Sequence, residues 1–346
     1  MRSFIPYDQL HGVDDPSRPP GSLVCGTWVR VLPQLGASGS DPVSDALASA
    51  IRTLALSITA RITGKPLMGL VSTYYGDSLR GLRRELRVTS KSSPSAHLAT
   101  IMCLALSDIL ENVTSRKATF LADEDWATAP FEVNGYSPLQ RLFGRFAAIP
   151  GTLEKMDNLN SQDITDAKLR LDELMTTVVD LENLAFTSVL QPTAPLYWSV
   201  QVHGSCEHEH DVTHCPLWFH DLSVANVFTH LWAFQIICFL NIATLWKMSP
   251  GLRKPEWFTL SSTSNVLDYC HARCTKLSIR ILRSVRFLTQ ESHMLFGPYS
   301  TVFPLQTACG VLGQDNGGRA ILQGLSKEFM DILDRERLRV LVPCLH

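Results

Sequence analysis

The stretch VANVFTHLWAFQIICFLNIATLW, residues 224–246, decides the fold of this chain and holds no charged residue. It is long enough to span a bilayer. However, no cluster of Lys and Arg flanks it, and it contains the polar residues Asn226, His230, Gln235 and Asn241. A helix that is apolar nearly all round is also typical of the centre of a large bundle. We therefore predict a long buried helix at about 222–247, at the centre of an irregular multi-helix bundle, and no membrane span.

Helical periodicity recurs on both sides of this stretch. Apolar residues repeat at steps of three and four, the α-helical period, from Leu47 to Ile62 and from Leu67 to Leu86. The same spacing predicts further helices at about 95–111, 139–149, 164–184, 264–290, 301–312 and 317–335. Pro150-Gly151 is expected to stop the helix before it. Because no strand alternation of convincing length is visible, the chain is predicted to be all-α.

Composition narrows the function classes. Charged residues make up 18% of the 346 positions, below the roughly 25% of a typical globular chain, so much of the chain is expected to be buried. Lys+Arg 31 nearly cancels Asp+Glu 33 for a net charge of −2, which argues against a globally basic nucleic-acid binder. Residues 1–40 are rich in Pro, Gly, Ser and Asp and read as an irregular segment before a helical domain at 41–340.

The nine cysteines are scattered along the chain, and several lie in apolar segments that are predicted to be helical, where free cysteine behaves as a small hydrophobic residue. The start, MRSFIPYDQLHG, has no apolar core of the length that a signal peptide needs. We therefore expect an intracellular protein with reduced cysteines. Cys270 and Cys274 lie one helical turn apart, and packing in the core is the favoured interpretation of this pair.

The segment VHGSCEHEHDVTHC is a candidate metal site. Imidazole and thiolate are the ligands that zinc prefers, and the segment supplies His203, Cys206, His208, His210, His214 and Cys215. The spacing between them is irregular, and a polar loop between two helices is the other interpretation. A zinc-dependent or recruited enzyme with its site at 203–215 therefore stays as an alternative function.

Other chemistry-bearing patterns are sparse. The chain has no nucleophile elbow, phosphate loop, dinucleotide fingerprint or paired-histidine metalloprotease helix. No catalytic or cofactor-binding residue is therefore predicted, and the chain is not expected to be an enzyme. A helix face with Arg80, Arg83, Arg84 and Arg87 is interleaved with Asp77 and Glu85. That interleaving favours a solvated surface with ordinary ion pairs.

Four sequence blocks, taken in their order along the chain, resemble the fungal-specific transcription factor domain. The first is DALASAIRTLALSITARITGKPLMGLVSTYYGDSLRGLRREL, residues 45–86, and the second is FLADEDWATAPFE, residues 120–132. LYWSV followed by LWFHDLSVANVFTHLWAFQII, within 196–237, is similar to the family's later tryptophan-bearing helices. SVRFL and GPYSTVFPLQTAC, within 284–309, are similar to its glycine–phenylalanine–proline–leucine block. Each block alone is degenerate, and the order of the four carries the resemblance.

This resemblance implies the helical regulatory domain of a six-cysteine zinc-cluster regulator. Such a protein is nuclear and often controls a metabolic gene cluster, for example one for secondary metabolites. The family's DNA-binding module is a run of six closely spaced cysteines near the N-terminus, whereas the first hundred residues here hold only Cys25. Direct DNA binding by this chain is therefore doubtful, and contacts with a protein partner, another copy or a small effector are expected instead. The resemblance also implies that helices present in relatives are missing near residues 112–117.

Overall fold

The structure is a computed structural model, and its described part is helical except for one short hairpin, which confirms the all-α prediction. The predicted irregular segment at 1–40 lies outside the described residues. The structure describes residues 45–63, 67–87, 100–101, 103–104, 107–108, 111–113, 115–123, 138–159, 164–187, 196–200, 215–249, 251–252, 265–290, 293, 296–314, 316–325 and 327–335.

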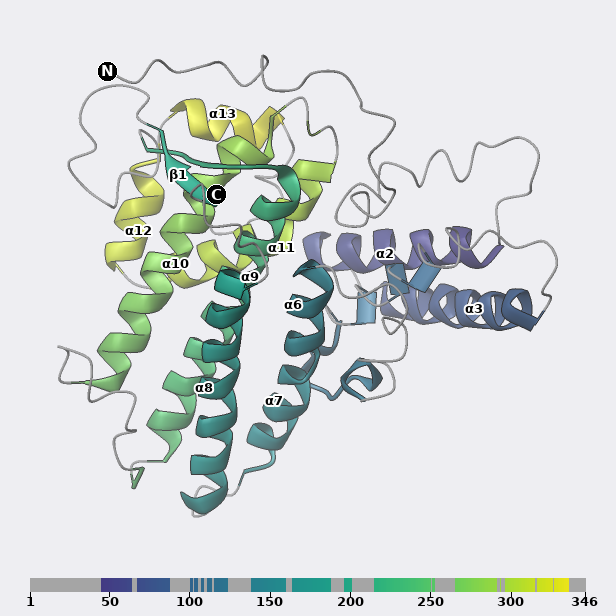
Figure 1. Cartoon of the computed structure of the whole chain (residues 1–346), viewed down its shortest axis with the longest axis horizontal. Helices are drawn as coiled ribbons and strands as arrows, with labels where there is room; N and C mark the ends of the chain where they lie inside the picture. Colours follow the sequence, from purple (N-terminus) through teal and green to yellow (C-terminus); the bar gives the residue numbers. More distant parts are fainter. Residues whose placement is uncertain are drawn as a thin grey trace.

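Helix α9, Leu222–Met248, is the centre of the bundle, as the sequence predicts. It packs against α8 (Ile164–Thr187), α10 (Val266–Leu288) and α11 (Phe296–Leu312), and also contacts α6 (Pro138–Ala147) and α7 (Ile149–Asp157). Figure 1 shows α9 between α10 on one side and α6 and α7 on the other. Phe234, Ile236, Cys238, Phe239 and Ile242 are all 0–1% exposed. A helix with apolar residues all round is stable in water only when neighbours cover it on every side.

Local chemistry fixes where α9 begins. The Asp221 carboxylate accepts a hydrogen bond from the Val224 amide and so caps the first turn. By length and composition alone, Val224–Met248 is long and apolar enough to cross a membrane. In the structure, 67% of its most apolar window is buried against the other helices, which favours the interpretation as a core helix.

Two helices precede this bundle in the chain. α2 (Asp45–Thr63) and α3 (Met68–Arg87) pack against each other, and α2 ends just before Gly64, a residue type common at helix C-termini. The two helices approach closely, because a Cβ atom on Gly81 would lie 2.9 Å from the Ala46 Cβ. The buried Ser78 hydroxyl donates a hydrogen bond to the Ala46 carbonyl oxygen at 2.8 Å. In Figure 1 this pair extends away from the helices around α9.

The prediction that Pro150-Gly151 stops a helix is wrong. α6 spans Pro138–Ala147, and α7 then begins at once and spans Ile149–Asp157. Pro150 lies in the first turn of α7, where the missing amide proton would have no partner inside the helix and the fixed φ suits the helical backbone. Proline therefore marks the start of a helix here.

The C-terminal helices form a second hydrophobic core. α11, α12 (Asn316–Gln323) and α13 (Lys327–Arg335) bury Leu305, Cys309, Leu322 and Leu333 against one face of α10. The sequence predicts one helix at 317–335, whereas the structure has two with Gly324 between them. The Gly324 amide donates to the Ala320 carbonyl oxygen and closes the last turn of α12.

The chain also contains a short β-hairpin that periodicity does not predict. β1 (Tyr197–Ser199) pairs antiparallel with β2 (Leu217–Phe219), with Trp198 opposite Trp218. Three-residue strands are too short for alternation to show in the sequence. Their aromatic side chains pack on the main core, where the Tyr197 ring meets the Trp232 ring edge-on at 5.5 Å between centroids. Packing against α9 and α10 therefore stabilises this hairpin.

Truncation of a core aromatic residue on α9 should destabilise the whole fold. Phe234 is 1% exposed, and its ring stacks on Phe146 of α6. We expect Phe234→Ala to lower the free energy of unfolding by about 3–5 kcal/mol, because it removes buried area and leaves a cavity. Urea unfolding followed by circular dichroism measures this change.

Val179→Ala on the outer side of α8 is the matched control, since Val179 is 47% exposed. We expect this change to cost roughly 0.5 kcal/mol or less. Equal effects of the two substitutions would contradict a central position for α9.

Candidate functional site

The candidate zinc segment lies almost wholly outside the described residues. Of its six candidate ligands, only Cys215 is described. The other five, His203, Cys206, His208, His210 and His214, stay predictions. The hairpin holds the two ends of this segment together, since the Val200 amide donates to the Pro216 carbonyl oxygen at 3.0 Å. Among the described residues, no three His, Cys, Asp or Glu side chains are placed to hold a metal ion.

Cys215 itself is disulfide-bonded and buried. A sulfur atom in a disulfide is not the thiolate that zinc requires, so the structure removes Cys215 from the predicted ligand set. The disulfide also departs from the expectation that the cysteines are all reduced. The Cys215 carbonyl oxygen accepts a hydrogen bond from Arg283 Nε of α10 at 2.5 Å, which ties this residue to the bundle.

Cys270 and Cys274 of α10 pack in the core, as predicted. Both are free thiols and 1% exposed. The Cys274 Sγ lies 3.8 Å from the Ile236 carbonyl oxygen of α9 and donates its proton to it. Burial raises the pKa of each thiol to about 12, so both stay protonated at neutral pH. Neither is an activated nucleophile in this setting.

The polar residues of α9 have different environments. Gln235 Nε2 lies 3.4 Å from Glu182 Oε1 of α8, and the same carboxylate receives Arg273 Nη2 of α10 at 2.5 Å. These contacts join three helices. The Asn226 side-chain amide, by contrast, is 1% exposed and makes no hydrogen bond in the described part of the chain. An unpaired buried amide costs about 1–3 kcal/mol.

His230 is held in its neutral form. Its Nδ1–H donates to the Asn226 carbonyl oxygen at 2.9 Å, and its ring stacks on Phe303 of α11 at 6.0 Å between centroids. Burial lowers the pKa of His230 to about 4, and the hydrogen bond to Asn226 offsets only part of this effect. Because the imidazole is uncharged at neutral pH, it packs beside the aromatic rings of Phe234 and Phe303.

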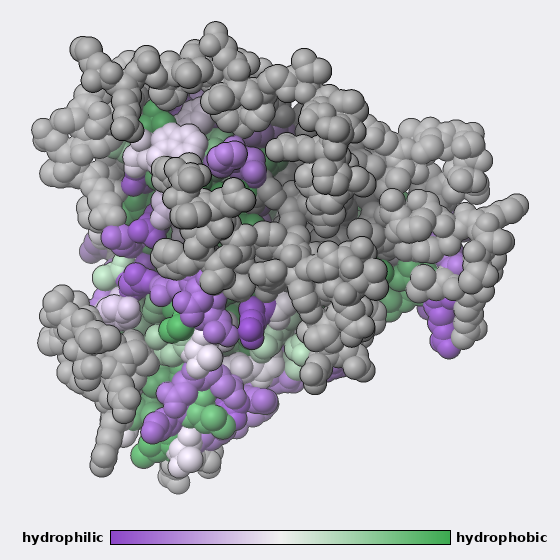
Figure 2. Space-filling model, viewed as in Figure 1, coloured by the Kyte–Doolittle hydropathy of each residue, from purple (hydrophilic) through white to green (hydrophobic). Residues whose placement is uncertain are grey.

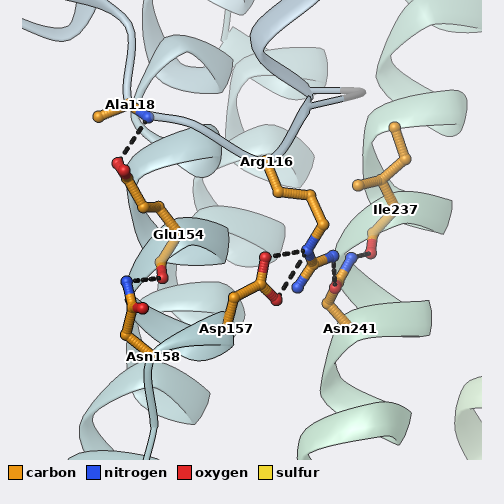
Figure 3. Close-up of polar contacts among 7 residues, drawn as sticks. All are labelled: Arg116, Ala118, Glu154, Asp157, Asn158, Ile237 and Asn241. Carbon is orange, nitrogen blue, oxygen red and sulfur yellow. Dashed lines mark hydrogen bonds and ion pairs between the residues drawn. The ribbon is translucent and has the colours of Figure 1, made fainter.

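A cluster of polar contacts centres on Arg116, shown in Figure 3. Its Nε donates to both carboxylate oxygens of Asp157 at the end of α7, at 2.9 and 2.8 Å. Its Nη1 donates to Asn241 Oδ1 of α9 at 2.8 Å. Asn241 in turn donates to the Ile237 carbonyl oxygen at 2.8 Å. One guanidinium group therefore joins the segment around residue 116 to two helices.

Neighbouring residues secure the same segment. The Ala118 amide donates to Glu154 Oε2 of α7 at 2.9 Å, which Figure 3 also shows. Thr119 donates to Asp108 and accepts from the Leu121 amide, which caps the short 3-10 helix η3 (Phe120–Ala122). Arg116 itself has φ 53°, a left-handed conformation that costs a non-glycine residue about 1–3 kcal/mol. Tertiary contacts therefore hold a backbone that arginine alone does not favour.

This cluster falls at the place where the resemblance implies missing helices, residues 112–117. The short connection is bonded to α7 and α9 through both its backbone and its side chains, and Thr119 is 5% exposed. The sequence gives no signal for the cluster, because Arg116 lies 41 residues from Asp157 and 125 from Asn241. In chemical terms the cluster contains no nucleophile beside a base. It ties the segment around residue 116 to α7 and α9.

The arginine face of α3 lies in solvent, as predicted. Arg80 Nη2 pairs with Asp77 Oδ1 at 2.6 Å, and both side chains are largely exposed. Arg83 and Arg84 are exposed as well. The side chain of Arg87 lies outside the described ones.

Comparisons with protein-family models, with curated proteins and with solved structures found no match for this chain. The resemblance to the fungal-specific transcription factor domain therefore rests on the quoted residues alone and stays a prediction.

Substitutions at Arg116 should separate the side-chain contacts from the backbone strain. We expect Arg116→Ala to lower the free energy of unfolding by about 1–3 kcal/mol, because Asn241 is 9% exposed and loses a charged donor. Arg116→Gly loses the same contacts but accepts φ 53° without strain. It should therefore be about 1 kcal/mol more stable than Arg116→Ala.

Lys117→Ala is the control, since Lys117 is the next residue and exposed. It should change the free energy of unfolding by less than about 0.5 kcal/mol. Urea denaturation of the four proteins measures these differences, and a loss at Lys117 as large as that at Arg116 would contradict a bonded junction.

His230 should make stability depend on pH. The unfolded chain binds a proton at this residue below about 6.5, whereas the folded chain does so only below about 4. The folded state is therefore fully stable with respect to this group above pH 6.5 and loses about 3 kcal/mol as the pH falls to 4. His230→Phe keeps a ring beside Phe303 and removes the titration.

Unfolding free energies of both proteins at pH 7, 5.5 and 4.5 give the measurement. The free energy of unfolding of the wild type should fall more steeply with decreasing pH than that of the variant. Parallel curves would show that the folded chain binds a proton at His230 as readily as the unfolded chain does.

Proposed function

We propose that this chain is a regulator of transcription that acts through contacts with a protein partner or a small effector. The observation that carries the proposal is the order of four sequence blocks that resemble the fungal-specific transcription factor domain. By that resemblance the protein is nuclear and controls a metabolic gene cluster, with secondary metabolism as the expected setting.

The positions of the blocks in the fold support this proposal. The first block forms the α2–α3 hairpin, and the second begins at η3, beside the Arg116 cluster. The third forms the β-hairpin strands and the first half of α9, and the fourth forms the end of α10 and most of α11. The third and fourth blocks meet in the main core, where Trp218 of β2 contacts the ring of Phe287 edge-on at 5.6 Å.

The character of the described residues also suits a regulatory domain. The long helix at the centre contributes to the core rather than to an open catalytic cleft. The described cysteines outside the disulfide are buried, and those whose pKa is shifted are protonated. We therefore expect this protein to act by binding other molecules at its surface.

Deletion of the gene is the direct test. We expect transcripts of a set of neighbouring metabolic genes to change, and the wild-type chain expressed from another locus to restore them. A fluorescent fusion of the restored protein should accumulate in nuclei. The matched control is Phe234→Ala, which should fail to restore transcription to the extent that the fold is lost. Unchanged transcripts together with exclusion from nuclei would overturn the proposal.

A gel-shift experiment with the purified chain tests the mode of action. We expect no sequence-specific binding to promoter DNA, because the six-cysteine module is missing from the sequence. Specific regulators bind their sites at about 10⁻⁸–10⁻¹¹ M. Binding of this strength by the chain alone would contradict action through a partner.

A further inference from the structure

The outer face of α3 differs along its length. Its first half carries small residues, Gly69, Ser72, Thr73 and Gly76, and its second half carries arginines. With 100° per residue, all of these positions point to one side of the helix. Ser72, Thr73, Arg80, Arg83 and Arg84 are exposed. We call this side, from Gly69 to Arg84, the outer face.

Each of the other two sides of α3 already has a neighbour in the chain. Gly81 and Ser78 contact Ala46 of α2 on one side. Tyr75 on another side packs with the small core that contains Cys103 and Leu104. The outer face is therefore the exposed side of a helix whose other two sides are packed against the rest of the chain.

The small-residue half is open to close approach. A Cβ atom on Gly69 would meet nothing within 4 Å, and one on Gly76 would meet only the flexible end of Arg80. Thr73 turns its hydroxyl back to the Gly69 carbonyl oxygen at 2.8 Å. Helices whose facing side chains are small can bring their backbones together. This half is a smooth surface on which another helix can lie.

The arginine half is a positive surface. Arg80 is paired with Asp77, whereas Arg83 and Arg84 have no carboxylate partner in the described part of the chain. Figure 2 shows strongly hydrophilic side chains over α3 at the right of the molecule. Leu79 and Leu70 are 41% and 51% exposed, and helical spacing places them at opposite edges of the face. Arginine is one of the residue types enriched in protein interfaces, and the exposed leucines add apolar area at the edges of the face.

We propose that the outer face of α3 binds an acidic amphipathic helix of a partner protein. The small half accommodates the helix backbone, Leu70 and Leu79 contact its apolar side chains, and Arg83 and Arg84 pair with its carboxylates. Arginine suits this role because its planar guanidinium binds a carboxylate through two hydrogen bonds. This inference rests on the proposed function, since it names the kind of partner through which the regulator acts.

Two other occupants fit the face less well. A second copy brings only the Asp77 carboxylate, which already pairs with Arg80, and in an antiparallel pair the arginines approach the positive end of the other α3. Nucleic acid offers no apolar side chains to Leu70 and Leu79 and would leave them exposed.

Photo-crosslinking from inside the face is the test. The full chain carries a benzophenone amino acid in place of Thr73 and is expressed in the organism that encodes it. After irradiation, the peptide attached at position 73 is sequenced by mass spectrometry. We expect a peptide of another protein, with Asp or Glu on one helical face and Leu, Ile or Phe on the other.

Charge reversal makes the test specific. R83E/R84E in the crosslinking chain should lower the yield of this adduct at least about tenfold, which corresponds to about 1.4 kcal/mol of binding free energy. K155E/K168E reverses two exposed lysines on α7 and α8 and should leave the yield unchanged. Circular dichroism of each purified variant shows that the helices are intact.

Four outcomes would overturn the proposal: an adduct with this chain itself, an adduct with nucleic acid, no adduct, or equal yields in the two charge-reversed variants. Transcript measurements separate this proposal from the proposed function. If the adduct forms as expected but R83E/R84E and gene deletion leave all transcripts unchanged, the docking surface stands and the proposed function fails. If deletion changes transcripts but no adduct forms, the docking surface fails alone.

Discussion

The burial of most of α9 is the constraint on which the rest of the structure depends. Because its many apolar residues would otherwise face water, α8, α10, α11 and the α6–α7 pair each supply an apolar face. α8 is amphipathic and its other face meets solvent, whereas α10 and α11 contribute side chains to both hydrophobic cores. The β-hairpin adds its aromatic rings at one end of α9, and α12 and α13 are then built on the far face of α10. The arrangement of the bundle thus follows from covering one helix.

The N-terminal helices obey a different constraint. α2 and α3 pack mainly on each other, with a small core of their own. The Arg116 cluster lies where the chain passes from this unit to the bundle, and its contacts are polar and directional. Such contacts set the geometry of the groups that they join. They contribute little to the free energy of unfolding, since an exposed ion pair adds at most about 1 kcal/mol. The cluster therefore fixes the connection around residue 116 to α7 and α9, whereas apolar burial stabilises the helices themselves.

This division bears on function. The described interior holds protonated thiols, a neutral histidine and aromatic rings, which suit packing. The outer face of α3, a helix of the N-terminal unit, carries exposed arginines beside small residues. Under the proposed function, the bundle would supply the stable core and α3 the exposed, charged face through which a partner binds.

The sequence by itself determined the all-α class, the central helix and the positions of most helices, because apolar periodicity indicates which residues are buried when the chain folds. It also determined that the arginines of α3 are in solvent and that Cys270 and Cys274 are not. Tertiary structure alone decided the β-hairpin and the contacts of Arg116. These features join residues far apart in the chain, and periodicity within one segment carries no information about which distant segment will pack beside it. The start of α7 at Ile149 and the break at Gly324 are local, but apolar periodicity continues across both and does not mark them.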